Sequence, residues 1–111
     1  MGRFVKGDVV VLPFPYTDLS NSKKRPACVI AEAGYHNDLI LCMITSQAVV
    51  DASAVAISKQ DFVDGGLPLD SNVRPNRLFT ANQTIVLNTV GHLSDEVVEK
   101  VVGEIMRIVT G

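Results

Sequence analysis

Short apolar runs separated by polar clusters organise this chain, and their spacing predicts a mainly β protein. Residues 8–14 are β-branched and aliphatic without helical spacing, which is typical of a strand. Similar runs recur, and we expect strands over residues 8–14, 26–33, 39–46, 53–58, 72–79 and 82–89. With 111 residues the chain is long enough for one core and well short of two, so we expect a single domain over 1–111.

The end of the chain predicts a helix, which makes the expected fold class α+β. Ser94 is a good N-cap, and Asp95 and Glu96 suit the positive end of a helix dipole. The apolar residues that follow recur at the spacing of one helix face: Val97, Val98, Val101, Val102, Ile105 and Met106. Because valine has a modest helix propensity, we expect core packing by this face to hold the helix in place.

A polar segment joins the first two expected strands. Pro13 and Pro15 should end regular pairing, and residues 16–25 are polar around a single leucine. Pro26 should open the next strand, which places Arg25 where the loop meets the sheet. Lys23, Lys24 and Arg25 then have two interpretations: solvated cations at a sheet edge, or a phosphate site in which the arginine fork binds oxygens.

The third expected strand, LILCMITSQ, is apolar until it ends in Thr45, Ser46 and Gln47. A strand end at the rim of a sheet is a suitable place for site residues. The plain alternative is a strand terminus at which the Thr45 hydroxyl bonds a neighbouring backbone group. The local pattern leaves both interpretations open.

Charge is unevenly distributed along the chain. A net charge of −2 argues against attraction of nucleic acid to the whole surface. Basic residues nevertheless gather in the first 25 positions and again at Arg74 and Arg77, whereas the middle and the last helix are acidic. If the fold brings the two basic clusters together, the chain has a local phosphate-binding face on an acidic body.

The residues that bind metals most readily are scattered. Cys28 and Cys42 lie inside apolar strands, and neither they nor His36 and His92 have the close spacing of a zinc site. We therefore predict no metal and no cofactor. The start of the chain lacks the apolar core of a secretion signal and no apolar run is long enough to cross a bilayer, so we expect a cytoplasmic protein without membrane attachment.

Three motifs in order, G-D-V-V-x-x-x-F-P-x-T-D-L from Gly7, R-P-A-x-V-I from Arg25 and I-T-S from Ile44, resemble the MazF/PemK family of toxin–antitoxin toxins. The match runs from Lys6 to about Ser46 and continues more weakly through SNVRPNRLFT to the helix. The resemblance implies a small SH3-like β-barrel of the CcdB/MazF/PemK type with a C-terminal helix. It further implies a homodimeric, metal-independent endoribonuclease that cuts single-stranded mRNA at particular sequences and is neutralised by a cognate antitoxin.

The resemblance also assigns candidate catalytic residues. Arg25 and Thr45 fall at the family's active-site Arg and Thr, and Arg74 falls at an Arg proposed to participate in the PemK branch. Asn76 stands where that branch has Asp, and this departure removes one candidate base because an amide takes no proton. Arginine stays protonated, so we expect Arg25 to act electrostatically on the phosphate while the 2′-hydroxyl attacks.

Further residues are candidates for binding the substrate. Phe14 and Tyr16 are expected to stack on bases, although core packing of Phe14 is an equal alternative. Amides and guanidinium groups match base edges, and hydroxyls and ammonium groups match phosphate; the remaining candidates are Thr17, Lys23, Lys24, Ser46, Gln47, Asn76 and Arg77. Two other functions stay open: a CcdB-like inhibitor that binds a protein such as gyrase, and a decayed toxin acting as a regulatory dimer. The RP and ITS elements favour the nuclease.

Overall fold

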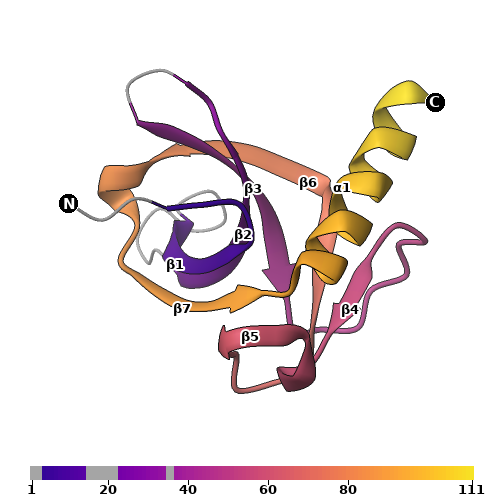
Figure 1. Cartoon of the computed structure of the whole chain (residues 1–111), viewed down its shortest axis with the longest axis horizontal. Coiled ribbons are helices and arrows are strands. Elements are labelled where there is room, and N and C mark those ends of the chain that lie inside the picture. The colour runs from indigo at the N-terminus through magenta and orange to yellow at the C-terminus, as the bar shows by residue number, and fades with distance from the viewer. Residues whose placement is uncertain (1–3, 15–22, 35–36) are drawn as a thin grey trace.

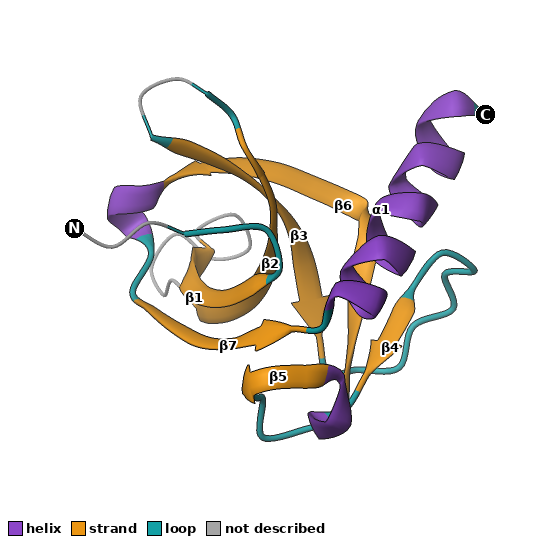
Figure 2. Cartoon of the chain, in the orientation of Figure 1, coloured by secondary structure: helices purple, strands orange, loops and turns teal. Residues whose placement is uncertain are grey.

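The computed structural model describes residues 4–14, 23–34 and 37–111 and shows one strongly curved antiparallel sheet with one α-helix beside it (Figures 1 and 2). Within these residues the strand order is β4-β6-β3-β2-β1-β7-β5. The elements are β1 (Asp8–Phe14), β2 (Lys23–Glu32), β3 (Asp38–Thr45), β4 (Val55–Ile57), β5 (Phe62–Gly65), β6 (Ser71–Asn82), β7 (Asn88–Leu93) and α1 (Asp95–Thr110), with short 3-10 helices at Lys59–Asp61 and Gln83–Ile85. The predicted fold class, a mainly β small barrel with a C-terminal helix, is confirmed.

The two faces of the sheet bury two separate cores, because side chains alternate along each strand. On the face that carries α1, Val9, Cys28 and Cys42 pack with Val97, Val98 and Val101 of the helix. The opposite face, which we call the inner face, buries Val10, Leu12, Phe14, Ala27, Val29, Leu39, Leu41 and Ala81. Because both faces of the central strands are buried, these strands are nearly continuous apolar runs, in which residues two apart lie on the same face.

The observed bounds of β6 and β7 differ from the strands predicted over residues 72–79 and 82–89. One strand, Ser71–Asn82, replaces the expected break after residue 79, and β7 begins at Asn88 rather than at 82. Opposite β3, Cys42 pairs with Leu78 while Met43 pairs with Arg74, so residues 75–77 form a bulge in the ladder. The bulge tolerates the buried Pro75, which has no N–H to donate to a ladder.

The predicted strand over residues 8–14 is confirmed as β1, but Pro13 and Pro26 both lie inside strands rather than at their ends. β1 continues through Pro13, which pairs with Lys24, and β2 begins at Lys23 rather than at Pro26. β3 joins β2 only from Ala27 onward. Residues 23–26 therefore pair with β1 on one side only and are an edge of the sheet. Pro26 has no N–H, and at such an edge no second strand needs that donor.

The helix has its predicted start and most of its predicted packing, since Val102 and Ile105 also pack against the core and only Met106 does not. The Ser94 hydroxyl accepts a hydrogen bond from the Val97 N–H at 3.4 Å, which confirms the N-cap. Val97, Val98 and Val101 are buried, but Met106 is 59% exposed because the last turns of α1 extend beyond the sheet (Figure 1). No helix in the described part of the chain has the length and apolarity needed to span a membrane.

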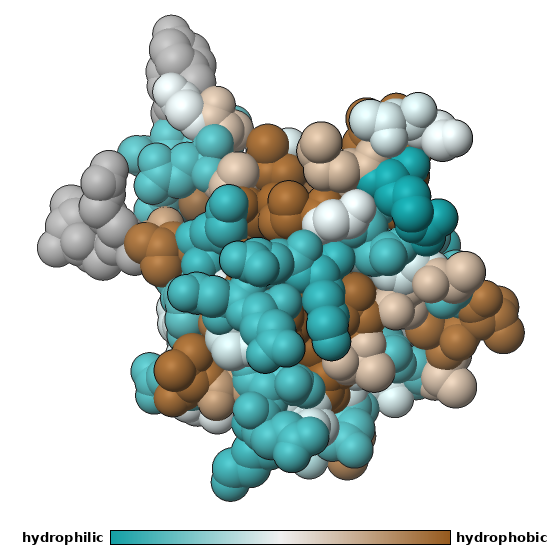
Figure 3. All heavy atoms as spheres, turned by 45° about the vertical axis from the view of Figure 1, so that its right-hand side comes forward, coloured by the Kyte–Doolittle hydropathy of each residue, from teal (hydrophilic) through white to brown (hydrophobic). Residues whose placement is uncertain are grey.

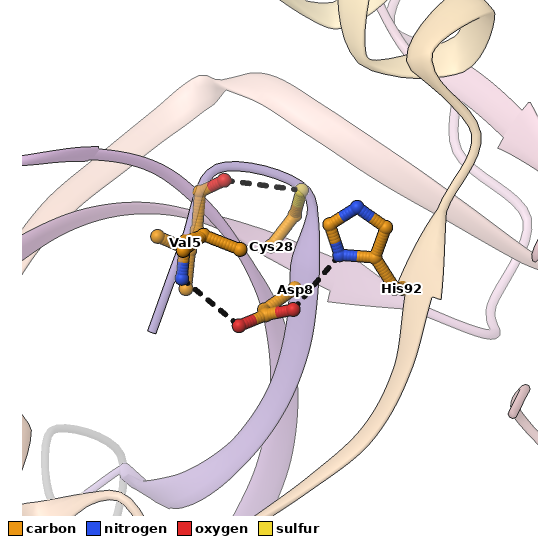
Figure 4. Close-up of polar contacts among 5 residues, drawn as sticks. Val5, Asp8, Cys28 and His92 are labelled. Atoms are coloured by element: carbon orange, nitrogen blue, oxygen red, sulfur yellow. Dashed lines mark hydrogen bonds and ion pairs between the residues drawn. The ribbon is translucent and has the colours of Figure 1, made fainter. Parts of the chain in front are cut away.

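The Gly-Asp pair at the start of β1 joins this strand to β7 and to the residues that precede it (Figure 4). The Asp8 carboxylate lies 2.8 Å from Nδ1 of His92 on β7 and accepts the Val5 N–H at 2.9 Å. Gly7 has a φ of +99°, and a Cβ there would lie 3.0 Å from the His92 ring. His92 is therefore a strand residue that joins β7 to β1.

Cys28 and Cys42 are free thiols that face each other across β2 and β3 under the helix. Burial, with smaller contributions from Cys42 and Asp8, raises the pKa of Cys28 to about 12. Burial raises the pKa of Cys42 to about 12 as well. Both thiols are thus held in the protonated, weakly nucleophilic form.

These thiols predict a loss of stability in alkali. Below pH 9 both thiols are protonated in the folded and in the unfolded chain. Between pH 9 and about 12 the thiols of the unfolded chain lose their protons while those of the folded chain keep them. The free energy of unfolding should therefore fall by about 1 kcal/mol per thiol by pH 10. Urea titrations at pH 8 and pH 10 measure this fall, and it should be smaller in the Cys28→Ala/Cys42→Ala variant. An equal fall in both chains would contradict the assignment.

The acidic character expected for the last helix lies on the surface. Asp95, Glu96 and Glu99 are exposed on α1. Figure 3 brings the side of α1 and β4 forward and shows a broad hydrophilic band, with apolar side chains in separate patches. This face offers little to an anionic ligand.

Candidate active site

Strand register brings the two principal candidates together at one end of the inner face. Ala27 of β2 pairs with Met43 of β3, and continuing this register by two residues places Arg25 opposite Thr45. Met43 also pairs with Arg74 of β6. Because directly opposed residues project to the same side of an antiparallel sheet, Arg25, Thr45 and Arg74 all project from the inner face.

Two hollows meet at this point. The larger, of about 440 Å³, is lined by Phe14, Arg25, Met43, Thr45, Gln47, Arg74, Arg77, Leu78 and Phe79. The smaller, of about 280 Å³, is lined by Lys24, Arg25, Pro26, Ile44, Thr45, Ser46, Gln47, Leu67, Pro68, Leu69 and Ser71. Arg25, Thr45 and Gln47 line both hollows, so they form the boundary between them.

The three arginines of the larger hollow differ in their partners. Within the described part of the chain, the guanidinium groups of the half-buried Arg25 and the exposed Arg77 make no hydrogen bond or ion pair, whereas that of Arg74 is paired with Asp51. Arg74 Nε and Nη2 donate to Oδ2 of Asp51 at 2.9 and 2.6 Å. The hollow thus contains a half-buried guanidinium whose donors are available to an anion. Of the first basic cluster, Arg25 lies with Arg74 and Arg77 in this hollow, whereas Lys6 lies beside α1.

The hydroxyl of Thr45 is oriented by its own turn. The Gln47 N–H donates to Thr45 Oγ1 at 3.1 Å, as in the side-chain turns that serine and threonine form. Because this bond uses an acceptor lone pair, the hydroxyl hydrogen remains available to donate to a ligand. The alternative foreseen for Thr45, a bond to neighbouring backbone, is therefore present and is compatible with a site role.

The apolar wall of the larger hollow contains an aromatic pair. The rings of Phe14 and Phe79 lie 5.0 Å apart at 70°, an edge-to-face contact, and Met43 and Leu78 complete the wall. Phe14 is only 4% exposed. Phe14 is therefore a core residue that supports the site wall, which agrees with the core-packing interpretation, and its stacking on a base stays a prediction.

Several predicted residues lie outside these hollows. Lys23 and Asn76 are exposed and line neither hollow, although Lys23 is two residues from Arg25 on β2. Lys6 lies beside the first turns of α1. Tyr16, Thr17 and His36 fall outside the described residues, as does most of the polar segment between β1 and β2.

Asp51 is the residue that sequence reasoning missed. It lies in the connection between β3 and β4, 23 residues before Arg74, and no local motif marks it. Within the described residues no group of three or more His, Cys, Asp or Glu side chains is arranged to hold a metal ion. The chemistry that this arrangement offers is the binding and stabilisation of an anion by guanidinium and hydroxyl donors.

Comparison with solved structures shows that the fold recurs. A MazF from Deinococcus radiodurans superimposes with a TM-score of 0.78 at 18% identity, with 100% of each chain covered. An endoribonuclease from a mycobacterial species, in complex with its cognate antitoxin, gives a TM-score of 0.75 at 14% identity, covering 99% of this chain and 96% of that chain. Curated protein sequences give no match. These identities establish the fold alone.

A family model supplies the assignment that structural likeness leaves open. The model describes the PemK-like, MazF-like toxins of type II toxin–antitoxin systems and matches residues 5–109. The matched range includes both hollows, the Gly-Asp pair and nearly all of α1. The chain belongs to the PemK-like, MazF-like toxin family of type II toxin–antitoxin systems.

Proposed function

We propose that this toxin is an endoribonuclease that cuts single-stranded RNA, without a metal ion, at particular sequences. The observation that supports it most directly is the half-buried Arg25 guanidinium, which has no partner among the described residues and lies opposite Thr45 where two hollows meet. The mycobacterial structural neighbour is named an endoribonuclease, which agrees with the proposal. An RNA substrate places the protein in the cytoplasm.

The proposed reaction is attack of a ribose 2′-oxygen on the adjacent phosphorus. The new O2′–P bond forms as the P–O5′ bond breaks, the 2′-hydroxyl loses its proton and O5′ gains one, leaving a cyclic phosphate and a 5′-hydroxyl. The crowded phosphorane carries extra negative charge on its oxygens. Arg25 and the Thr45 hydroxyl donate to these oxygens, and each preorganised donor is worth about 3 kcal/mol in a site sheltered from water. Arg74 adds positive charge from β6.

The hollows on either side give the RNA strand a course through the site. We place one base against the wall of Phe14 and Phe79, with Arg77 at its edge, and the neighbouring nucleotide near Ser46, Gln47 and Lys24. Lys23 and Asn76 then contact the strand where it leaves the hollows. Bases that enter separate hollows must be unstacked, which favours single-stranded RNA over a duplex.

The first test is incubation of the purified chain with a long single-stranded RNA in excess EDTA, followed by mapping of the ends. Cuts at a short recurring sequence that leave cyclic phosphate and 5′-hydroxyl ends would support the proposal. Intact RNA would overturn it and favour an inhibitor that binds a protein target. Cleavage only after addition of a divalent ion would overturn the metal-independent mechanism.

We further propose a homodimer and a cognate antitoxin with an acidic segment that covers Lys23, Lys24 and Arg25. Both lysines are exposed beside the smaller hollow, so charge attraction would bring such a segment over the site. A Lys23→Ala/Lys24→Ala variant should bind the antitoxin about tenfold more weakly, with a smaller salt dependence, in calorimetric titrations. Unchanged affinity and salt dependence would exclude this surface.

The homodimer has its own test. Sedimentation at micromolar concentration that shows only a 12 kDa species would exclude the dimer.

A further inference from the structure

Asp51 and Arg74 form a well-defined ion pair beside the proposed site. Two guanidinium nitrogens, Nε and Nη2, donate to one carboxylate oxygen of Asp51 at 2.9 and 2.6 Å. Both side chains are 21% exposed, so the pair is largely shielded from solvent. Charged hydrogen bonds of this kind are the strong ones, and they restrict the rotamers of a long arginine side chain.

The two partners have different relations to the hollows. Arg74 lines the larger hollow together with Arg25 and Thr45, whereas Asp51 lines neither hollow. The carboxylate therefore binds the guanidinium from the side away from the site. Arginine has five N–H donors and Asp51 receives two of them, which leaves the others for a ligand.

We infer that Asp51 is a positioning residue, which holds the Arg74 guanidinium in the larger hollow so that its remaining donors meet the phosphate. This inference rests on the proposed function. The backbone of Arg74 is fixed by pairing with Met43, but the bulge over residues 75–77 follows immediately. A long side chain at such a place needs a second anchor to keep one orientation, and Asp51 supplies it.

The negative charge of Asp51 has a second consequence for the same hollow. Arg25, Arg74 and Arg77 all line it, and like charges in a partly shielded space repel one another. Pairing with Asp51 offsets the charge of Arg74 and leaves Arg25, at the boundary between the hollows, as a cation with no partner among the described residues. Asp51 therefore lets a second guanidinium stand near the phosphate without displacing the first.

The kinetic test compares Asp51→Ala, Asp51→Asn, Arg74→Ala and the Asp51→Ala/Arg74→Ala double variant. Asp51→Ala should lower kcat/KM for RNA cleavage between about 10-fold and 100-fold, as misplaced site groups do, with kcat falling more than KM rises. Asp51→Asn, which keeps the shape without the charge, should lose less. The double variant should be no slower than Arg74→Ala, because a residue that acts through Arg74 has no effect once Arg74 is gone.

Glu104→Ala is the matched control. Glu104 accepts hydrogen bonds from Nε and Nη2 of Arg107 at 3.2 and 2.6 Å, so it forms the same kind of pair on α1, and neither residue lines the two hollows. This variant should cut RNA at the native rate. A comparable loss in Glu104→Ala would overturn the inference, since the effect would then not depend on the site.

A readout independent of cleavage tests the contact itself. The Arg74 side-chain Nε–H resonance should be shifted and slow to exchange in the native chain, and it should lose both properties in Asp51→Ala at unchanged thermal stability. Cleavage by Asp51→Ala at the native rate, or additive losses in the double variant, would overturn the positioning role alone. Intact RNA with the native chain would instead overturn the proposed function.

Discussion

Replacing Arg25 by alanine is expected to lower kcat for RNA cleavage about a thousandfold and to leave the fold intact. Removal of a single preorganised donor costs 100-fold to 1,000-fold in comparable sites, and Arg25 supplies a full charge in addition. Within the described residues its guanidinium has no protein partner, so its loss leaves no buried group unsatisfied. Single-turnover cleavage of a short RNA, with a thermal melt of each chain, measures both quantities.

Two further variants identify the source of that loss. Arg25→Lys keeps the charge and removes the planar fork, so it should recover only part of the rate if the geometry of the donors matters. Arg107→Ala removes an arginine from the exposed side of α1 and should leave the rate unchanged. A loss of less than tenfold in Arg25→Ala would show that the phosphate is stabilised elsewhere.

The sequence pattern predicts the central part of the fold because the energetics there are local and repetitive. β1, β2, β3 and α1 consist of apolar residues at the right period, and Ser94 marks the start of the helix. Arg25 and Thr45 could be paired as candidates through the family motifs. Their position opposite each other needs the register of β2 and β3, which no pattern within either strand contains.

The features that escaped prediction depend on contacts between distant segments. β5 contains one aromatic residue and one valine before a glycine, too little for a strand pattern, and it exists because it pairs with β7. The single long β6 needs a bulge to accommodate Pro75. Asp51 becomes part of the site only because the connection after β3 folds back to β6, so sequence inspection had no means of selecting it.

Some residues of the family motifs stabilise the fold and others belong to the proposed site, and their positions on β1 and β2 decide which. Gly7 and Asp8 lie at the start of β1 beside β7, where the Asp8 carboxylate contacts His92 and the Gly7 carbonyl accepts the Leu93 N–H, and these contacts hold the two strands together. Arg25 lies where β2 extends past β3, and its donors have no partner among the described residues. A shared motif thus contains residues with different roles, which only their contacts distinguish.

Gly65→Ala is expected to give the largest loss of stability of any alanine substitution at a glycine in the described chain. Gly65 has a φ of +67°, and a Cβ there would lie 2.0 Å from the Val90 carbonyl oxygen and 2.7 Å from the Gly91 Cα. Both obstacles are backbone atoms of β7, so no side chain can move aside. We expect the free energy of unfolding to fall by about 3 kcal/mol, measured by urea titration.

Gly103→Ala is the matched control and should change stability in the opposite direction. Gly103 is an exposed position inside α1, and a Cβ there would meet nothing within 4 Å. Alanine should stabilise the helix there by about 1 kcal/mol. Equal effects of the two substitutions would contradict the assigned geometry of β5 and β7.

The same substitution connects the edge of the sheet to the proposed site. Leu67, Pro68 and Leu69 follow Gly65 after one further residue, Gly66, and form one wall of the smaller hollow. If the Cβ separates β5 from β7, this wall shifts while Arg25 and Thr45 stay in place on β2 and β3. Gly65→Ala should therefore raise KM for RNA more than it lowers kcat at a temperature where it remains folded. An unchanged KM would show that RNA does not use the smaller hollow.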